Sequence, residues 1–176
     1  MEAVLTGLTV RRLQADDADR MAGLYARMSP LSRYRRYLSV APALPADRLR
    51  ALVNVDEYRH IGFVAVHGDD IVAVARYVRL RSQPDRAEVA VEVADEWQRQ
   101  GVGRSLLLAL TEHARGNGIE AFTATMSREN VPILRLLRSI ASGIQFSYEG
   151  PLAEAVIPLD GVRVAADRSV PERRVA

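Results

Sequence analysis

Two spacings of apolar residues along the chain, period two and period three to four, predict a mixed α/β protein. Runs with strand character cover residues 5–10, 61–66, 71–78, 88–94, 121–126, 144–148 and 153–158. Helical spacing and capping residues predict helices over residues 16–25, 31–38, 45–53, 105–116 and 130–140. The Gly and Asp residues at 67–70 predict a tight hairpin turn between two of the strands.

The segment at 88–94 has the clearest alternation. Val89, Val91 and Val93 fall on one face of the predicted strand, and Glu88 and Glu92 fall on the other. We expect the valine face to pack into the core, which leaves the two carboxylates on a separate face.

Length and composition fit one soluble domain. At 176 residues the chain has room for a single core, and we expect a domain over residues 1–162 followed by a tail at 163–176. The apolar runs fall short of the ~20 residues that a membrane span needs, and the first residues lack the pattern of a secretory signal. These features predict a cytoplasmic protein with no membrane partner.

The charge pattern argues against a nucleic-acid partner. All 24 cationic side chains are arginines, 22 side chains are anionic, and the net charge is only +2. Local clustering is therefore required for any basic surface. A basic and aromatic stretch at residues 33–37 (RYRRY) either borders a binding site or forms a solvated helix face, and we favour the solvated face.

Two residue types are absent, cysteine and lysine. Their absence excludes thiolate nucleophiles, sulfur-based zinc sites and lysine Schiff bases. His60, His67 and His113 lack the spacing of metal ligands, so we expect no metal. The remaining chemistry must come from carboxylates, histidines, hydroxyls, arginines or backbone groups.

Residues 98–105 place two glycines between a buried strand and the start of a helix. Free amides at a helix N-terminus hold anions, and Gly101 and Gly103 would let a phosphate approach the backbone closely. A dinucleotide fingerprint needs a third small residue where Leu106 stands, and a phosphate-binding P-loop needs a lysine. The alternative without function is a helix that follows a glycine-rich turn.

The stretch Gln98-Arg99-Gln100-Gly101-Val102-Gly103 resembles the Q/R-x-x-G-x-G/A signature of the GNAT superfamily of acetyltransferases. Residues 29–37, 87–90 and 129–132 are similar to the acetyltransferase domain of mycobacterial-type protein lysine acetyltransferases. Over residues 5–160, this resemblance implies the GNAT fold, an α/β (α+β) fold with a mixed, mostly antiparallel central sheet of six to seven strands flanked by helices.

The resemblance also implies that acetyl-CoA is the co-substrate. Main-chain groups of Val91 and Val93 would pair with its pantetheine arm, and Asn130 would contact the same arm. The pyrophosphate would be held by the loop, whose residues are Gln98, Arg99, Gln100, Gly101, Val102, Gly103, Arg104 and Ser105.

Catalysis in this family needs a base, because only a neutral amine is nucleophilic. Glu88 matches the catalytic glutamate of the protein acetyltransferases, and Glu92 is the reserve candidate. Without the resemblance, cross-strand pairing with Arg76 or Arg79 is an equal alternative for both. Leu137 stands where many relatives have a tyrosine acid, so the general acid is open.

We expect direct transfer of acetyl to a primary amine, with a protein lysine as the acceptor. Two alternatives stay open: an enzyme that acetylates a small-molecule amine, and a non-catalytic sensor that binds acyl-CoA. The sequence leaves the acceptor, the acyl-chain length and the oligomeric state undetermined.

Overall fold

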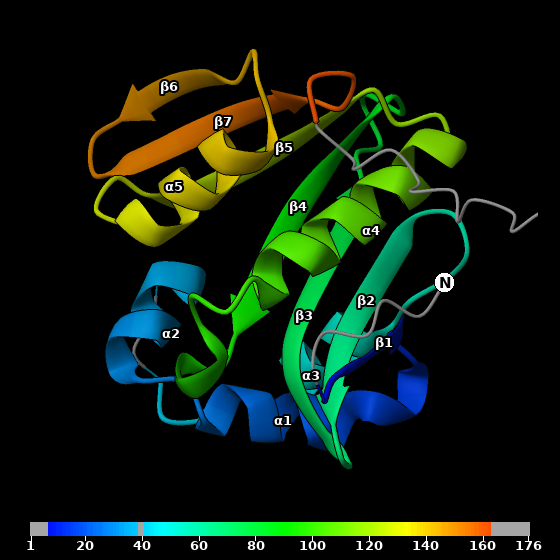
Figure 1. Ribbon diagram of the computed structural model, residues 1–176, viewed down its shortest axis with the longest axis vertical. Helices are drawn as coiled ribbons and strands as arrows, with labels where there is room; N and C mark the ends of the chain where they lie inside the picture. The colour runs from blue at the N-terminus through cyan, green and yellow to red at the C-terminus, as the bar shows by residue number, and fades with distance from the viewer. Residues whose placement is uncertain (1–6, 39–40, 163–176) are drawn as a thin grey trace, which may run out of the picture.

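Seven strands form one twisted sheet in the computed structural model, which describes residues 7–38 and 41–162 (Figure 1). The strands are β1 (Thr9–Arg12), β2 (His60–His67), β3 (Asp70–Arg79), β4 (Arg86–Val93), β5 (Ala121–Ser127), β6 (Gln145–Glu149) and β7 (Leu152–Pro158). Their order in the sheet is β1-β2-β3-β4-β5-β7-β6. Neighbours are antiparallel except β4 and β5. This arrangement confirms the predicted mixed, mostly antiparallel sheet.

Five α-helices accompany the sheet: α1 (Ala18–Ala26), α2 (Pro30–Tyr37), α3 (Ala46–Val53), α4 (Val102–Gly116) and α5 (Val131–Ile140). Two short 3-10 helices cover Ala15–Asp17 and Asp95–Trp97. Within the described ranges, no helix has both the length and the apolar character needed to cross a bilayer.

Two predicted boundaries differ from the structure by three residues or more. The first strand is Thr9–Arg12 instead of 5–10, because it pairs antiparallel with β2 from Thr9 onward; residues 5 and 6 lie outside the described ranges. Helix α4 starts three residues earlier than predicted, since Gly101 adopts φ 84° and so ends the loop there. The predicted tail at 163–176 also lies outside the described ranges.

The helices cover the sheet from two sides (Figure 1). On one side, Leu106 and Leu110 of α4 join Tyr77 of β3 and Val89 of β4 in a buried cluster. On the other side, α1 and α3 pack on Val74 of β3 and its neighbours. Successive residues of a strand point to opposite faces, so each side of β4 meets a different set of helices.

The sheet opens along β4. Strand β4 pairs with β5 only from Arg86 to Glu88, and beyond Glu88 the two strands diverge. Figure 1 shows β4 running away from β5 toward α2. The divergence leaves the second half of β4 with a strand partner on one edge alone.

Candidate functional site

A cavity of about 640 Å³ lies where β4 leaves β5, a volume within the usual range for a ligand site. Residues of β4, the glycine loop, β5, the start of α5 and one face of α2 line it. The structure brings almost all the predicted site residues to this cavity, namely Glu88, Val91, Glu92, Val93, Gln98, Arg99, Gly101, Val102, Gly103, Arg104 and Asn130.

Two residues of the predicted loop site do not line the cavity. The side chain of Gln100 donates a hydrogen bond of 2.7 Å to the carbonyl of Glu96. The amide of Ser105 donates to the carbonyl of Gly101 at 3.0 Å, so this amide already belongs to the helical ladder. Neither group is available for a phosphate in this arrangement.

The open edge of β4 presents backbone groups to the cavity. Leu80 donates its amide to the carbonyl of Arg86, and Ala94 donates its amide to Val72, so the even-numbered residues of β4 bond toward β3. Hydrogen bonding in an antiparallel pair alternates, which turns the N–H and C=O groups of Val91 and Val93 toward the gap. A ligand arm that runs along this edge would find unpaired donors there.

The face of β4 that carries Val89, Val91 and Val93 is less buried than we predicted. Val89 is buried as expected, with 8% of its surface exposed, but Val91 and Val93 are only partly buried and border the cavity. The reason is the divergence of β5 after Glu88, which removes the strand that would have covered these two side chains.

The glycine loop ends in an uncapped helix. Arg99 and Gly101 both have left-handed backbone conformations, with φ of 62° and 84°. Gly101 is the N-cap of α4 and has no side chain to accept from the first-turn amides of Val102 and Gly103. Uncapped amides and the helix dipole make this end of α4 suited to an anion.

Gly103 lies at a point of close packing. A Cβ at this position would lie 3.3 Å from Cγ2 of Val93 and 3.6 Å from Cδ2 of Leu136. Only a very small residue therefore fits between β4 and α5, which is the physical reason for a small residue at this place in the motif.

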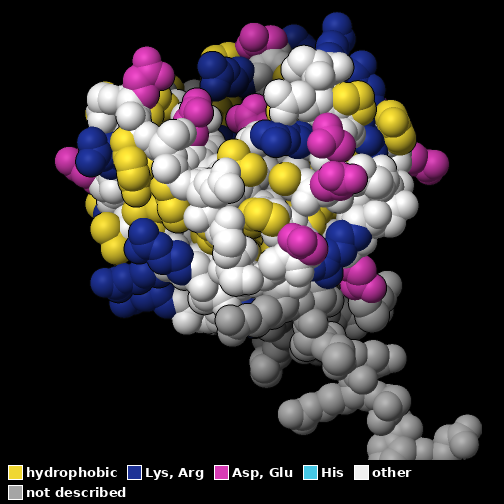
Figure 2. All heavy atoms as spheres, turned by 90° about the horizontal axis from the view of Figure 1, so that it is seen from above, with side chains coloured by type: hydrophobic (Ala, Val, Ile, Leu, Met, Phe, Trp, Pro, Cys, Tyr) yellow, Lys and Arg dark blue, Asp and Glu magenta, His cyan; other side chains and the backbone are white. Residues whose placement is uncertain are grey.

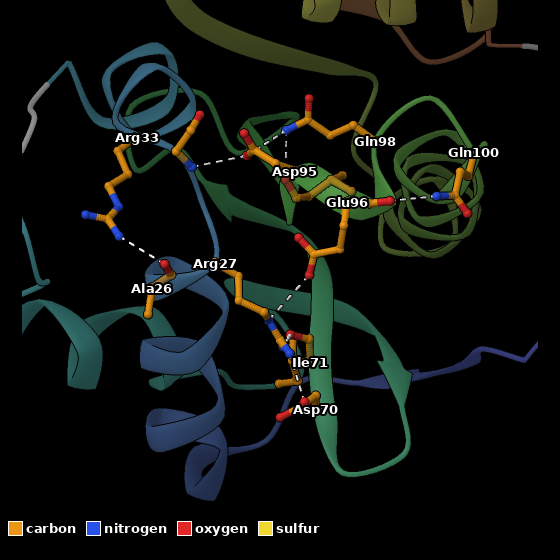
Figure 3. Close-up of polar contacts among 11 residues, drawn as sticks. Ala26, Arg27, Arg33, Asp70, Ile71, Asp95, Glu96, Gln98 and Gln100 are labelled. Carbon is orange, nitrogen blue, oxygen red and sulfur yellow. Dashed lines mark hydrogen bonds and ion pairs between the residues drawn. The ribbon is translucent and has the colours of Figure 1, made fainter.

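The loop is braced by its own polar side chains (Figure 3). Gln98 donates to the Val93 carbonyl at 3.1 Å, to the Asp95 carboxylate at 3.2 Å and to the Ser32 hydroxyl at 3.3 Å. Asp95 accepts from the Ser29 amide at 3.3 Å. Partial burial pushes the pKa of Asp95 up, but hydrogen bonds from Ser29 and Ser32 outweigh it and hold the pKa below its usual value.

The two candidate carboxylates have different surroundings. Glu88 is exposed at the cavity, and no side chain within residues 7–38 and 41–162 forms an ion pair or hydrogen bond with it. Glu92 is buried, with 3% exposed. Its Oε1 accepts from Nε of Arg36 at 3.1 Å and its Oε2 accepts from the Tyr37 hydroxyl at 2.6 Å.

The cross-strand alternative for these carboxylates is wrong in the described part of the chain. Arg79 donates to the carbonyls of Pro84 and Asn117 instead. Arg76 lies within electrostatic range of Glu88 and Glu92, but its Nε is buried without a hydrogen-bond partner. Burial, followed by repulsion from Arg36, lowers the pKa of Arg76.

Helix α2 supplies residues that were not among the predicted site residues, and α5 adds Arg135. Ser32, Arg35 and Arg36 of α2 all line the cavity. The basic stretch at 33–37 is therefore more than the solvated helix face that we favoured. The sequence pattern identified this basic stretch but did not show which side of the helix faces the cavity. On the face drawn in Figure 2, positive and negative side chains are interspersed, without a broad field of one sign.

Asn130 connects two elements of the site. Its Oδ1 accepts from the Ile133 amide at 3.4 Å and so caps α5, and its Nδ2 donates to the carbonyl of Arg35 at 3.4 Å. Leu137 also borders the cavity and is buried, with 2% exposed, so this position offers no hydroxyl for proton transfer.

The model of the "Acetyltransferase (GNAT) family" matches residues 30–140. The chain belongs to this family. It is an acetyltransferase by family, and the glycine loop, the open edge of β4 and the start of α5 all fall within the matched region.

Similar proteins agree with this assignment. The chain is 30% identical to acetyltransferase Pat of Mycolicibacterium smegmatis over 73% of its length and to acetyltransferase PA5475 of Pseudomonas aeruginosa over 78%. It spans 39% of the first protein and 73% of the second. The crystal structure of the GNAT domain of S. lividans PAT superposes with a TM-score of 0.79 at 28% identity and covers 86% of this chain and 90% of that chain. These matches confirm the GNAT fold and the resemblance to mycobacterial-type protein acetyltransferases.

Proposed function

We propose that the protein is an acetyl-CoA-dependent N-acetyltransferase that transfers acetyl directly to a primary amine, with a protein lysine as the acceptor. The observation that carries the proposal is a single cavity that combines an unpaired strand edge, an uncapped helix N-terminus and a free carboxylate.

The unpaired groups along the cavity lie in the same order as the parts of acetyl-CoA that they would bind. Amide-rich pantetheine fits the N–H groups of Val91 and Val93 and the C=O of Val91, which face the gap; the Val93 carbonyl already accepts from Gln98. The diphosphate fits the first turn of α4, and Arg99 and Arg104 at the same end add cationic donors. Asn130 lies on the opposite wall of the cavity, where the pantetheine arm would pass.

The reaction then needs one proton transfer. The neutral amine attacks the thioester carbonyl, a C–N bond forms, and the amine proton passes to the Glu88 carboxylate. Collapse of the tetrahedral intermediate breaks the C–S bond and releases the CoA thiolate. An amide of Val91 or Val93 would stabilise the oxyanion. A thiol with a pKa near 8.5 leaves without full protonation, so Leu137 in place of a hydroxyl is compatible with turnover.

The protein-lysine acceptor rests on similarity and on the exposure of Glu88. The relatives with 30% identity include acetyltransferase Pat, and the sequence around Glu88 and Asn130 resembles the protein lysine acetyltransferases. Glu88 is exposed, so a lysine on a protein surface has access to it.

Calorimetric titration with acetyl-CoA and with CoA, followed by a thiol-release assay, tests the proposal. We expect saturable binding of both ligands and acetylation of lysine peptides in preference to small amines. Preference for a small amine would contradict the acceptor, binding without transfer to any amine would indicate a sensor, and no binding would overturn the cofactor assignment.

A further inference from the structure

Helix α2 is held over the cavity mainly by polar contacts, with one aromatic contact in which the Tyr37 ring lies edge-on to the buried Tyr25 of α1 at 5.3 Å between centroids. None of its eight residues is buried. Its contacts with the site are the Ser29 amide on Asp95, Ser32 with Gln98, the Arg35 carbonyl with Asn130, and Arg36 and Tyr37 with Glu92. Arg33 also donates to the carbonyls of Tyr25 and Ala26 at the end of α1. An element that buries so little apolar surface has low local stability, so its polar contacts have a large share in deciding where α2 lies.

The contacts with Glu92 are the strongest of this set. The Tyr37 bond is 2.6 Å and the Arg36 bond is 3.1 Å, whereas the other three are 3.3–3.4 Å. The Glu92 side chain is 1% exposed, and charge-assisted bonds shielded from water are worth more than exposed ones. Each carboxylate oxygen accepts a hydrogen bond and the side chain is buried, so Glu92 is less accessible to a substrate amine than the exposed Glu88.

We propose that Glu92 is a positioning residue, which holds α2 through Arg36 and Tyr37 so that this helix forms the wall of the acceptor side of the cavity. The inference rests on the proposed function. Glu88 and Glu92 share one face of β4 and are about 13 Å apart along the strand, and Ser32, Arg35 and Arg36 of α2 border the same cavity. The helix therefore bounds the space that an amine must enter to reach Glu88.

If Glu92 positions α2, its replacement should change the KM for the acceptor and leave the affinity for acetyl-CoA nearly unchanged. The backbone groups of Val91 and Val93 lie on the edge of β4, and loss of the Glu92 side chain does not move their partners on β3. A displaced α2 changes the shape of the acceptor side. Removing a charge-assisted bond worth about 1.5–3 kcal/mol corresponds to roughly a 10- to 100-fold change in an equilibrium constant.

The test compares Glu92→Gln with a matched buried carboxylate elsewhere. Asp17 is fully buried and accepts from Arg11 at 2.7 Å, yet it lies outside the cavity. We expect Glu92→Gln to raise the KM for the lysine peptide about tenfold, with acetyl-CoA affinity within about twofold and the pH dependence of turnover retained. Asp17→Asn should lower the melting temperature without changing either KM. Tyr37→Phe, which removes a single bond at nearly constant volume, should show the same KM effect in milder form.

Hydrogen exchange of the α2 amides gives a readout that needs no activity. Glu92→Gln should speed exchange over residues 30–38, and Asp17→Asn should not. Unchanged exchange and unchanged peptide KM in Glu92→Gln would overturn the proposal, as would a loss of turnover above about a hundredfold together with a flattened pH profile, which is the behaviour of a base. If the wild-type protein acetylates no amine, the exchange result still decides whether Glu92 positions α2.

Discussion

Glu88 and Glu92 stand four residues apart on one face of one strand, and the fold gives them opposite surroundings. Glu88 lies where β5 diverges and no helix covers the strand, so its carboxylate is exposed at the cavity. Glu92 lies under α2, where it is buried and bonded to Arg36 and Tyr37. An exposed carboxylate without hydrogen-bond partners is accessible to a substrate proton, whereas a buried one that binds Arg36 and Tyr37 holds its surroundings in place.

The sheet face that carries Glu88 and Glu92 continues onto the neighbouring strands, where it also has a covered part and an open part. The covered part of this face also holds Arg76, whose buried Nε lacks a hydrogen-bond partner. The open part holds Glu88 and the exposed Val78, which is opposite Glu88 in the β3–β4 register. We therefore expect stability to respond to changes in the covered part and turnover to respond to changes in the open part.

The largest expected effect is on turnover when the open carboxylate is neutralised. Glu88→Gln keeps the shape and removes the base, which costs about 10²- to 10⁴-fold in kcat. The free energy of unfolding should change by less than about 0.5 kcal/mol, because Glu88 is exposed. Steady-state kinetics and urea denaturation on one preparation measure both quantities, and a stable, fully active variant would abolish the distinction between the two glutamates.

The opposite pattern is expected for the covered pair. Arg36→Met leaves the Glu92 carboxylate buried without its cation, which should lower the free energy of unfolding by about 3 kcal/mol. The double variant Arg36→Met/Glu92→Leu removes both charges and should recover part of this loss. Denaturant unfolding compares the wild type, Arg36→Met and the double variant. A double variant less stable than Arg36→Met would contradict the claim that the unpaired, buried Glu92 charge causes the loss of stability.

A substitution at Gly103 in the glycine loop should leave the carboxylates of Glu88 and Glu92 undisturbed. Gly103→Val places extra atoms against Val93 and Leu136, where even a Cβ has 3.3 Å to the nearest neighbour, and overpacking of this kind costs about 1–3 kcal/mol. We expect acetyl-CoA affinity to fall, with Gly103→Ala as the milder matched control. If Gly103→Val binds acetyl-CoA like the wild type, the loop does not hold the diphosphate.

The smallest effect concerns the pH dependence of stability. Burial, followed by the charge of Arg76, lowers the pKa of His60 from 6.5, so the folded state binds a proton less readily than the unfolded state. The stability that neutral His60 contributes is present above pH 6.5 and is lost as the pH falls through the folded pKa. His113 has a lowered pKa as well and acts in the same direction. Melting temperatures between pH 5 and 8 should therefore decline on acidification, and His60→Gln should reduce the slope without removing it; an unchanged slope would contradict a role for His60.

The sequence predicts the fold and the cofactor edge well, because both depend on local patterns. Alternation marks the strands, and Gly101 and Gly103 mark the start of α4 within three residues. Glu88 as the base came from the family resemblance. The burial of Glu92 was not predictable, because its partners Arg36 and Tyr37 lie 56 and 55 residues away in the sequence. The position of α2 is set mainly by polar contacts and by the single ring contact of Tyr37 with Tyr25, which leave no periodic apolar signal.

One measurement compares the two carboxylates directly: the pH dependence of single-turnover acetyl transfer by Glu88→Gln and Glu92→Gln, each loaded with acetyl-CoA and given saturating lysine peptide. We predict that Glu88→Gln is slow and loses the rise in rate with pH, whereas Glu92→Gln keeps that rise and a rate near that of the wild type. The reverse result, a slow Glu92→Gln with a flat profile beside an active Glu88→Gln, would contradict the assignment of Glu88 as the base.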